Sequence, residues 1–171
     1  LTIGNYDRLT ASAAIGGPIS QNTAYRLAVQ SNKSDGYIDN IYLHRATNDI
    51  GEFTARGKFN WQVNDAFSLD FTMFYSDVNN GYDAFSLDNN RETYSDEPGH
   101  DELESLAASL SASWKINDGL ALEGLLSRVN ADTEYGYDED WSHTGICDGT
   151  ACDSEIWGFD WWYSSTDNYI R

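Results

Sequence analysis

Hydrophobic and polar residues alternate one by one along residues 52–63, which read EFTARGKFNWQV. The apolar or small side chains occupy every second position: Phe53, Ala55, Gly57, Phe59, Trp61 and Val63. A period of two is typical of a β-strand with one apolar and one polar face. In a soluble sandwich the apolar face points into a core, whereas in a membrane barrel it points into lipid and the polar face lines the lumen.

The same alternation predicts five further strands, at residues 8–16, 24–32, 67–76, 103–116 and 120–134. Leu and Ala in the segment 103–116 also suit a helix that starts at Asp101, but its Ser-rich second face and the Asn-Asp-Gly turn after it favour a strand. The stretch LEGLLSRV in the last segment alternates less regularly, so we expect a bulge or a register change there.

Short and long connections alternate between the predicted strands. GGPISQN, NDA and NDG are short and rich in turn residues, whereas residues 33–51, residues 77–102 and the segment after Tyr135 are long. Long loops are uncommon in a compact domain, but outer-membrane barrels have short periplasmic turns and long extracellular loops. Aromatic residues near the strand ends suit the interfacial girdles of such a barrel: Trp61, Phe67, Tyr75, Trp114 and Tyr135. We therefore expect an all-β, antiparallel, up-and-down transmembrane β-barrel segment of about six strands.

Composition narrows the possible partners and compartments. A formal net charge of −18 and a pI near 4.1 argue against nucleic-acid binding, which needs basic stripes. An aromatic content of 14% argues against disorder, and no apolar run is long enough for a transmembrane helix. The first residues, LTIGNYDRLT, lack signal-peptide features and an initiator Met, so we expect a mature product or a piece of a longer chain.

The only two cysteines, Cys147 and Cys152, lie close together in GICDGTACDSE. We predict a disulfide in an exposed loop of a protein that has met an oxidising compartment. A pair of free thiols is the alternative. A zinc site is disfavoured because the spacing is unusual for zinc and there is no second pair.

Several segments resemble TonB-dependent outer-membrane receptors of the ferric-siderophore type. They are GNYDRLTASAAIGGPISQNTAYRLAVQSNKSDGYIDN, EFTARGKFNWQVNDAFSLDFTMFYSDVNNGYD and YGYDEDW. The resemblance implies a 22-stranded barrel filled by an N-terminal plug, with uptake powered by periplasmic TonB through a box that precedes the plug. It implies that residues 1–171 belong to the barrel domain, start at the end of its first strand and carry the next six strands. We expect the plug to be absent from this chain.

Aromatic residues in the predicted loops are the main candidates for ligand contact, because rigid rings supply contact area at low entropic cost. The candidates are Tyr82, Phe85, Tyr94, Tyr137, Trp141, Trp157, Phe159, Trp161, Trp162 and Tyr163. Alternatively, these rings pack the loops together or sit in the interfacial belt.

Three basic residues are expected on the lumen side. Arg26, Arg56 and Lys58 alternate with the apolar positions of their strands, so they could steer an anionic ferric chelate inward. Pairing with carboxylates on a plug or on neighbouring strands is the structural alternative.

The acidic segments DNNRETYSDEPGHDELE and YDEDW suit a solvated outer surface that faces cation-bridged lipopolysaccharide. Oxygen ligands also suit Ca²⁺ or Mg²⁺, but DVNNGYD lacks the ligand spacing of an EF-hand, so we predict no metal site and no cofactor. His44, His100 and His143 fall in predicted loops without a nucleophile nearby, so we predict no enzyme.

The sequence therefore predicts an outer-membrane receptor for a ferric siderophore or a similar large nutrient. Its expected partners are the ligand, outer-membrane lipid, lipopolysaccharide and TonB. The alternative is a secreted β-sandwich module that binds carbohydrate through acidic loops, with or without Ca²⁺.

Overall fold

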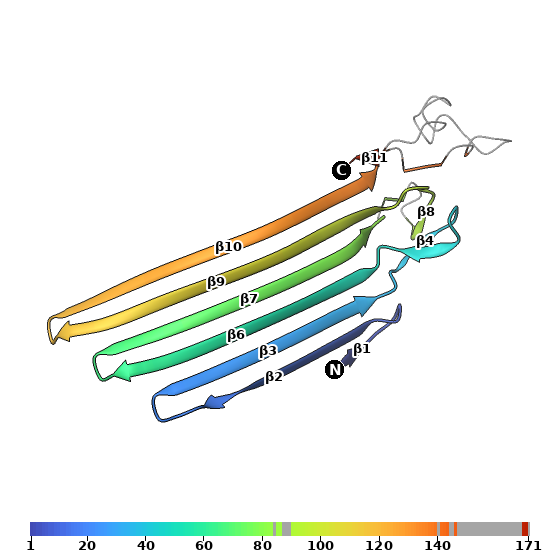
Figure 1. The fold of residues 1–171 in the computed structure, drawn as a ribbon. Coiled ribbons are helices and arrows are strands. Elements are labelled where there is room, and N and C mark those ends of the chain that lie inside the picture. Colours follow the sequence, from blue (N-terminus) through green and yellow to red (C-terminus); the bar gives the residue numbers. More distant parts are fainter. Residues whose placement is uncertain (84, 87–89, 140, 144–145, 147–168, 171) are drawn as a thin grey trace.

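The computed structural model describes residues 1–83, 85–86, 90–139, 141–143, 146 and 169–170. Every regular element in these ranges is a β-strand. The main sheet has eight strands in the order β1-β2-β3-β6-β7-β9-β10-β11, and all its pairs are antiparallel (Figure 1). The long strands are β2 (Leu9–Pro18), β3 (Thr23–Ser34), β6 (Ile50–Asn64), β7 (Phe67–Tyr82), β9 (Gly99–Asn117) and β10 (Leu120–Asp138). The two edge strands, β1 (Thr2–Ile3) and β11 (Tyr169–Ile170), are short.

The six strands expected from alternation are the six long strands of the sheet, and residues 103–116 are strand, not helix. The strands extend further than predicted at the end where the long loops lie: β7 continues to Tyr82, and β9 already starts at Gly99. The expected irregularity in LEGLLSRV is wrong, because β10 pairs with β9 in continuous register from Ala121 to Gly136 and shifts only at Leu120/Ala121. Consecutive Leu125 and Leu126 disturb the hydrophobic pattern without disturbing the hydrogen-bonded ladder.

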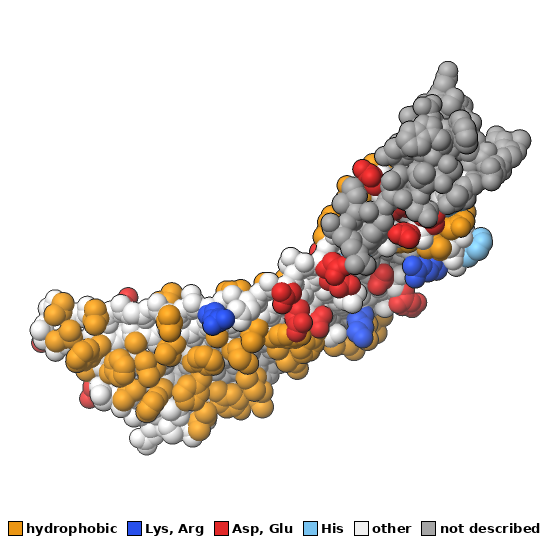
Figure 2. Space-filling model, turned by 45° about the horizontal axis from the view of Figure 1, so that its top comes forward, with side chains coloured by type: hydrophobic (Ala, Val, Ile, Leu, Met, Phe, Trp, Pro, Cys, Tyr) orange, Lys and Arg blue, Asp and Glu red, His pale blue; other side chains and the backbone are white. Residues whose placement is uncertain are grey.

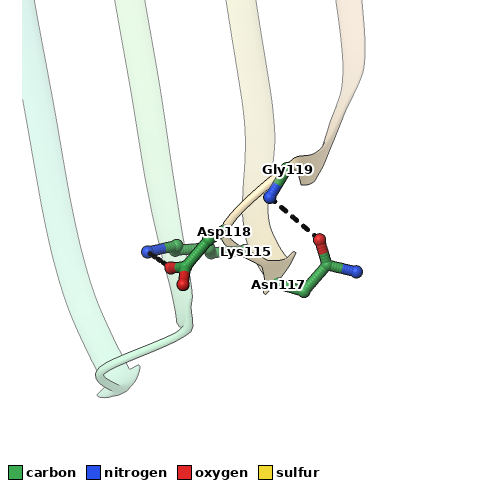
Figure 3. Close-up of polar contacts among 4 residues, drawn as sticks. All are labelled: Lys115, Asn117, Asp118 and Gly119. Atoms are coloured by element: carbon green, nitrogen blue, oxygen red, sulfur yellow. Dashed lines mark hydrogen bonds and ion pairs between the residues drawn. The ribbon is translucent and has the colours of Figure 1, made fainter.

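The three short connections lie together at one end of the sheet, and the long ones lie at the other (Figure 1). Both Asn-Asp turns use the same local device. Asn64 Oδ1 accepts a hydrogen bond from the Ala66 N–H at 2.9 Å, and Asn117 Oδ1 accepts one from the Gly119 N–H at 2.9 Å. These side chains mimic a backbone turn. The second turn also carries an ion pair between Lys115 and Asp118 at 2.8 Å (Figure 3).

One face of the sheet is apolar over the half nearest the short turns. Residues paired in register point to the same side, so rows can be followed across the strands. The middle row consists of Tyr25, Phe59, Phe71, Leu110 and Leu126. We define the apolar band as the five rows that pass through Trp114, Ala112, Leu110, Ala108 and Leu106 of β9. Figure 2 shows hydrophobic side chains gathered over this half, with acidic side chains between it and the loop end.

A carboxylate row borders the apolar band on the loop side. Asp77, Glu104 and Asp132 lie opposite one another on three neighbouring strands. Like charges directly opposite one another destabilise a sheet, so the row is suited only to a strongly hydrated environment. The band is less complete on β10, where Arg128 projects on the same face and its Nε donates to Asn130 Oδ1 at 3.2 Å.

The sheet has no dry centre in the part of the chain that the structure describes. Ile38 is the one buried hydrophobic residue there, whereas Phe53, Phe71 and Trp114 are 41%, 41% and 49% exposed. No helix in these ranges has both the length and the apolar character to cross a membrane. The apolar face is therefore not covered by a second layer within the described residues.

A small three-stranded sheet sits at the loop end, in the order β5-β4-β8 (Figure 1). Its strands are β4 (Ile38–Asn40), β5 (Arg45–Thr47) and β8 (Glu92–Thr93). It was not predicted, because strands of two or three residues are too short to establish a hydrophobic period. The pairing of β4 with β8 is parallel and joins two of the long connections.

Candidate functional site

A buried carboxylate lies just beyond the end of β7 and holds the long connections together. Asp83 is 5% exposed, and its Oδ2 accepts hydrogen bonds from Asn40 Nδ2 at 3.1 Å and Thr47 Oγ1 at 2.8 Å. Thr93 Oγ1 also donates to Oδ2, at 2.6 Å, and Ser95 Oγ donates to Oδ1 at 2.7 Å. We call these five residues the loop clamp.

The loop clamp is well satisfied, as buried polar groups need to be. Asn40 Nδ2 also donates to the Ser95 carbonyl at 2.8 Å, and Asn40 Oδ1 accepts the Leu43 N–H at 2.8 Å. All four donors to Asp83 are neutral groups, and within the described residues no Lys, Arg or His forms an ion pair with it. The clamp therefore satisfies a buried carboxyl group with neutral donors alone, within the described residues.

A cavity of about 470 Å³ opens beside the loop clamp. This volume lies in the range of small-molecule sites. The described residues that line it are aromatic, acidic and hydroxyl-bearing: Tyr82, Asp83, Phe85, Ser95, Tyr135, Tyr137, Asp138 and Trp141. We call this cavity the aromatic cleft.

The rings of the aromatic cleft form two groups. Phe85 and Trp141 stack with their centroids 4.0 Å apart and their planes at 18°. Tyr135 meets the edge of Tyr82 at 5.2 Å and lies 6.0 Å from Tyr137. These distances lie in or near the range in which aromatic pairs attract, so the rings support one another.

Strand register explains why tyrosines from distant segments meet here. Tyr82 lies opposite Gly99 in β9, and Asp101, two residues further along β9, lies opposite Tyr135 in β10. All of these positions belong to the polar face of the sheet. A Cβ at Gly99 would come within 1.9 Å of the Gly136 carbonyl oxygen, so glycine permits the close approach of β9 and β10 beneath the rings.

The chemistry of the cleft is acidic and hydrogen-bonding. Asp138 is 3% exposed, and its Oδ1 accepts the Trp141 N–H at 3.1 Å. A hydrogen bond with Tyr82, reinforced by desolvation and by nearby negative charge, raises the pKa of Tyr135 to about 12. Tyr135 is therefore a neutral phenol at ordinary pH and keeps its O–H.

The structure brings together four of the aromatic residues singled out in the sequence: Tyr82, Phe85, Tyr137 and Trp141 line one cavity. Tyr82 and Tyr137 belong to the ends of β7 and β10 and not to loops as expected, because these strands are longer than predicted. Tyr94 is half-buried and does not line the cleft.

The remaining candidates of the C-terminal segment lie outside the described residues: Trp157, Phe159, Trp161, Trp162, Tyr163 and the predicted disulfide of Cys147 and Cys152.

Sequence reasoning missed the acidic half of the site. It placed Asp138 in a solvated acidic segment and considered Asp83 only as the end of DVNNGYD, a poor match to a calcium loop, but both are buried. Ser95 was not singled out, and Tyr135 was expected only as an interfacial aromatic. The sequence does contain one signal for the position of Asp83. This residue directly follows a long alternating segment, and a side chain at the end of a strand is fixed in position by the sheet.

The three basic candidates do share the polar face of the sheet. Arg26 lies directly opposite Lys58, and Arg56 lies opposite Ala28 on the same pair of strands. All three side chains are exposed, and none forms an ion pair within the part of the chain that the structure describes. Like charges directly opposite one another are destabilising, so Arg26 and Lys58 do not stabilise the pairing of β3 with β6.

The histidines occupy three different settings. His100 belongs to β9 and not to a loop, and its Nε2 lies 3.2 Å from Glu134 Oε1. His143 stacks on Tyr42 at 4.0 Å, and His44 adopts a left-handed backbone with φ of 53°. The DVNNGY part of the segment considered for Ca²⁺ forms the end of β7. Among the described residues, no group of three or more His, Cys, Asp or Glu is arranged to hold a metal ion.

Comparison with known proteins gave no match to any family model and no match to a solved structure.

Proposed function

We propose that this chain forms part of the wall and outer loops of a TonB-dependent outer-membrane receptor that takes up a ferric siderophore or a similar large nutrient. The membrane assignment rests chiefly on the apolar band. The receptor class rests on the resemblance of its sequence segments to that family. In this proposal the apolar face contacts lipid, the polar face lines the lumen, and the aromatic cleft lies at the outer mouth.

The height of the apolar band fits a bilayer. Trp114 and Leu106, its outermost rows on β9, delimit a stretch of nine residues. A tilted transmembrane strand needs about 9–11 residues to cross the bilayer. The carboxylate row begins at the next outward-facing position, Glu104, where water would replace hydrocarbon.

The length of the strands fits the same picture. β10 has 19 residues, roughly twice the 9–11 residues that a tilted strand needs to cross the bilayer. The acidic half would project beyond the lipid and carry the loop clamp and the cleft. Tyr75, in the last row of the band, has its hydroxyl 3.3 Å from both Asp77 and Glu104, as suits an interfacial tyrosine.

A β-sandwich that binds carbohydrate would need its apolar face covered by a second sheet. The described residues contain no such layer, and the band lies open to the surroundings. This observation favours the membrane wall over the sandwich.

The lipid-facing assignment is tested by exchanging neighbouring residues of opposite face in the intact protein. Phe59→Arg places a charge in the middle row of the band and should cost about 2–4 kcal/mol, so less protein should assemble in the outer membrane. Lys58→Leu, one residue away on the polar face, should assemble normally. The measurement is the folded fraction in isolated outer membranes. Equal assembly of both variants would remove the proposal.

The transport assignment needs a separate measurement. Cells lacking the intact gene should lose uptake of one radiolabelled ferric siderophore or another large nutrient, and the complemented strain should regain it. Uptake that persists without TonB would contradict the proposed receptor class.

A further inference from the structure

We propose that the aromatic cleft binds a positively charged organic group, such as a quaternary ammonium, and so selects ligands that carry one. This inference rests on the proposed function, because it names the ligand chemistry of the receptor's outer site. It does not follow from the resemblance, which implies only a ferric chelate or another large nutrient. Its basis is the pairing of aromatic faces with two buried carboxylates.

The first observation is the charge of the cleft lining. Asp83 and Asp138 are 95% or more buried, and both line the cavity. The hydrogen bonds to Asp83 come from a neutral amide and neutral hydroxyls, which hold the carboxylate in place without cancelling its charge. A cavity with partly desolvated walls and fixed charges of one sign concentrates the opposite sign.

The second observation concerns basic residues. None of the described residues that line the cleft is Lys, Arg or His. The sequence itself contains no Lys or Arg between Arg128 and Arg171, although this stretch is rich in Asp and Glu. The described lining of the cleft is therefore aromatic, acidic and hydroxyl-bearing, without a basic side chain.

The third observation is the abundance of aromatic rings. Phe85, Trp141 and three tyrosines border the same cavity. Ring faces attract cations, most strongly for Trp and Tyr, within about 6 Å of the ring centre. An ammonium group gains from both the rings and the carboxylates, whereas a neutral group of the same shape gains only apolar contact.

The basic residues of the polar face are too distant to reverse this preference. Arg56, the nearest of the three along the strands, lies opposite Phe74 in β7, eight residues before Tyr82, which is about 26 Å along the strand. This distance is several times the screening length of about 8 Å at physiological ionic strength. The cleft and the three basic residues of the polar face therefore act on a ligand at separate positions.

The experiment compares choline with 3,3-dimethylbutan-1-ol, its neutral carbon isostere, on the intact purified protein in detergent. Saturation-transfer NMR measures the signal of the three equivalent methyl groups in each probe. We expect at least a fivefold larger effect for choline at equal concentration. Equal effects for the two probes, or binding of a neutral disaccharide without binding of choline, would overturn the inference.

Paired variants locate the binding. Trp141→Leu and Asp138→Asn should each reduce the choline signal at least threefold. The control variants Tyr37→Leu and Asp39→Asn change exposed residues outside the cleft and should leave the signal unchanged. An unchanged signal in both cleft variants would overturn the inference. All four variants should assemble like the parent protein, and assembly is scored in the same preparations. Loss of choline selectivity in well-assembled protein would refute only the cleft inference, whereas tolerance of Phe59→Arg would refute the membrane proposal.

Discussion

At the scale of single residues, the most consequential side chain is a carboxylate that touches no cation among the described residues. Asp83 accepts four hydrogen bonds from groups that lie ten or more positions away in the sequence. Hydrogen bonds to a charged group are stronger than those between neutral groups. The arrangement of the loop end therefore depends on the hydrogen bonds to Asp83 more than on the packing of apolar side chains.

Replacing this carboxylate should loosen the small sheet. Asp83→Ala leaves several buried donors without their acceptor, and we expect a loss of about 3 kcal/mol of local stability. The Asp39 and Ile41 amides, which donate to Arg91 O and Thr93 O, should then exchange with deuterium roughly 100-fold faster. Mass spectrometry of the corresponding peptide in the intact protein measures this change.

Asp39→Ala is the matched control, because the Asp39 side chain is exposed on the same strand. It should leave the exchange rates unaltered. Full protection in Asp83→Ala would mean that the loop clamp does not hold β4 in place.

At the scale of elements, the alternation of side chains accounts for the strands, and local chemistry accounts for the turns. Every residue of a long strand contributes to the period, so an occasional exception such as Arg128 does not hide it. The loop clamp is different: its residues lie between positions 40 and 95, in segments too short to show any period. Sequence reasoning therefore predicted the sheet but identified only the aromatic part of the cleft.

Two adjacent glycines of β2 provide a test of strand packing. A Cβ at Gly16 would lie 2.6 Å from the Tyr25 carbonyl oxygen, whereas one at Gly17 would meet nothing within 4 Å. Gly16→Ala should therefore lower the free energy of unfolding by about 1–3 kcal/mol. Gly17→Ala should raise it by about 0.4–1 kcal/mol, because the unfolded chain loses freedom.

Urea unfolding of the intact protein in lipid vesicles would compare these two variants with the parent. Opposite signs are expected. If both substitutions stabilise or both destabilise, the close approach of β2 and β3 at Gly16 is not rigid.

At the scale of the whole molecule, the sheet is divided into an apolar half and an acidic half, and this division would set its orientation in the proposed membrane. The carboxylate row follows the band without an intervening row. Moving the sheet along its strands by a few residues would place either carboxylates in hydrocarbon or rows of leucine and phenylalanine in water. Both are costly, so the depth of the sheet in a membrane should be sharply defined.

Tryptophan fluorescence can measure this depth. Trp61 and Trp114 belong to rows of the apolar band, whereas Trp141 lines the cleft at the loop end. Lipids brominated on their acyl chains should quench the emission of the intact protein in vesicles. Replacing both band tryptophans by Phe should remove at least half of the quenching contributed by this chain.

Trp141→Phe is the corresponding control and should leave lipid quenching unchanged while reducing quenching by aqueous acrylamide. If the double variant retains full quenching by brominated lipid, the apolar band is not the part of this chain that meets the acyl chains.

The strictly sequential order of the six long strands has one further consequence. Long strands that follow one another in the sequence pair with one another in the sheet, so none depends on a crossing connection. A hairpin could be duplicated or deleted without rethreading any other part of the chain. In the proposed barrel, the circumference of the wall can therefore change in steps of two strands over evolution, while the chemistry at its rim changes independently.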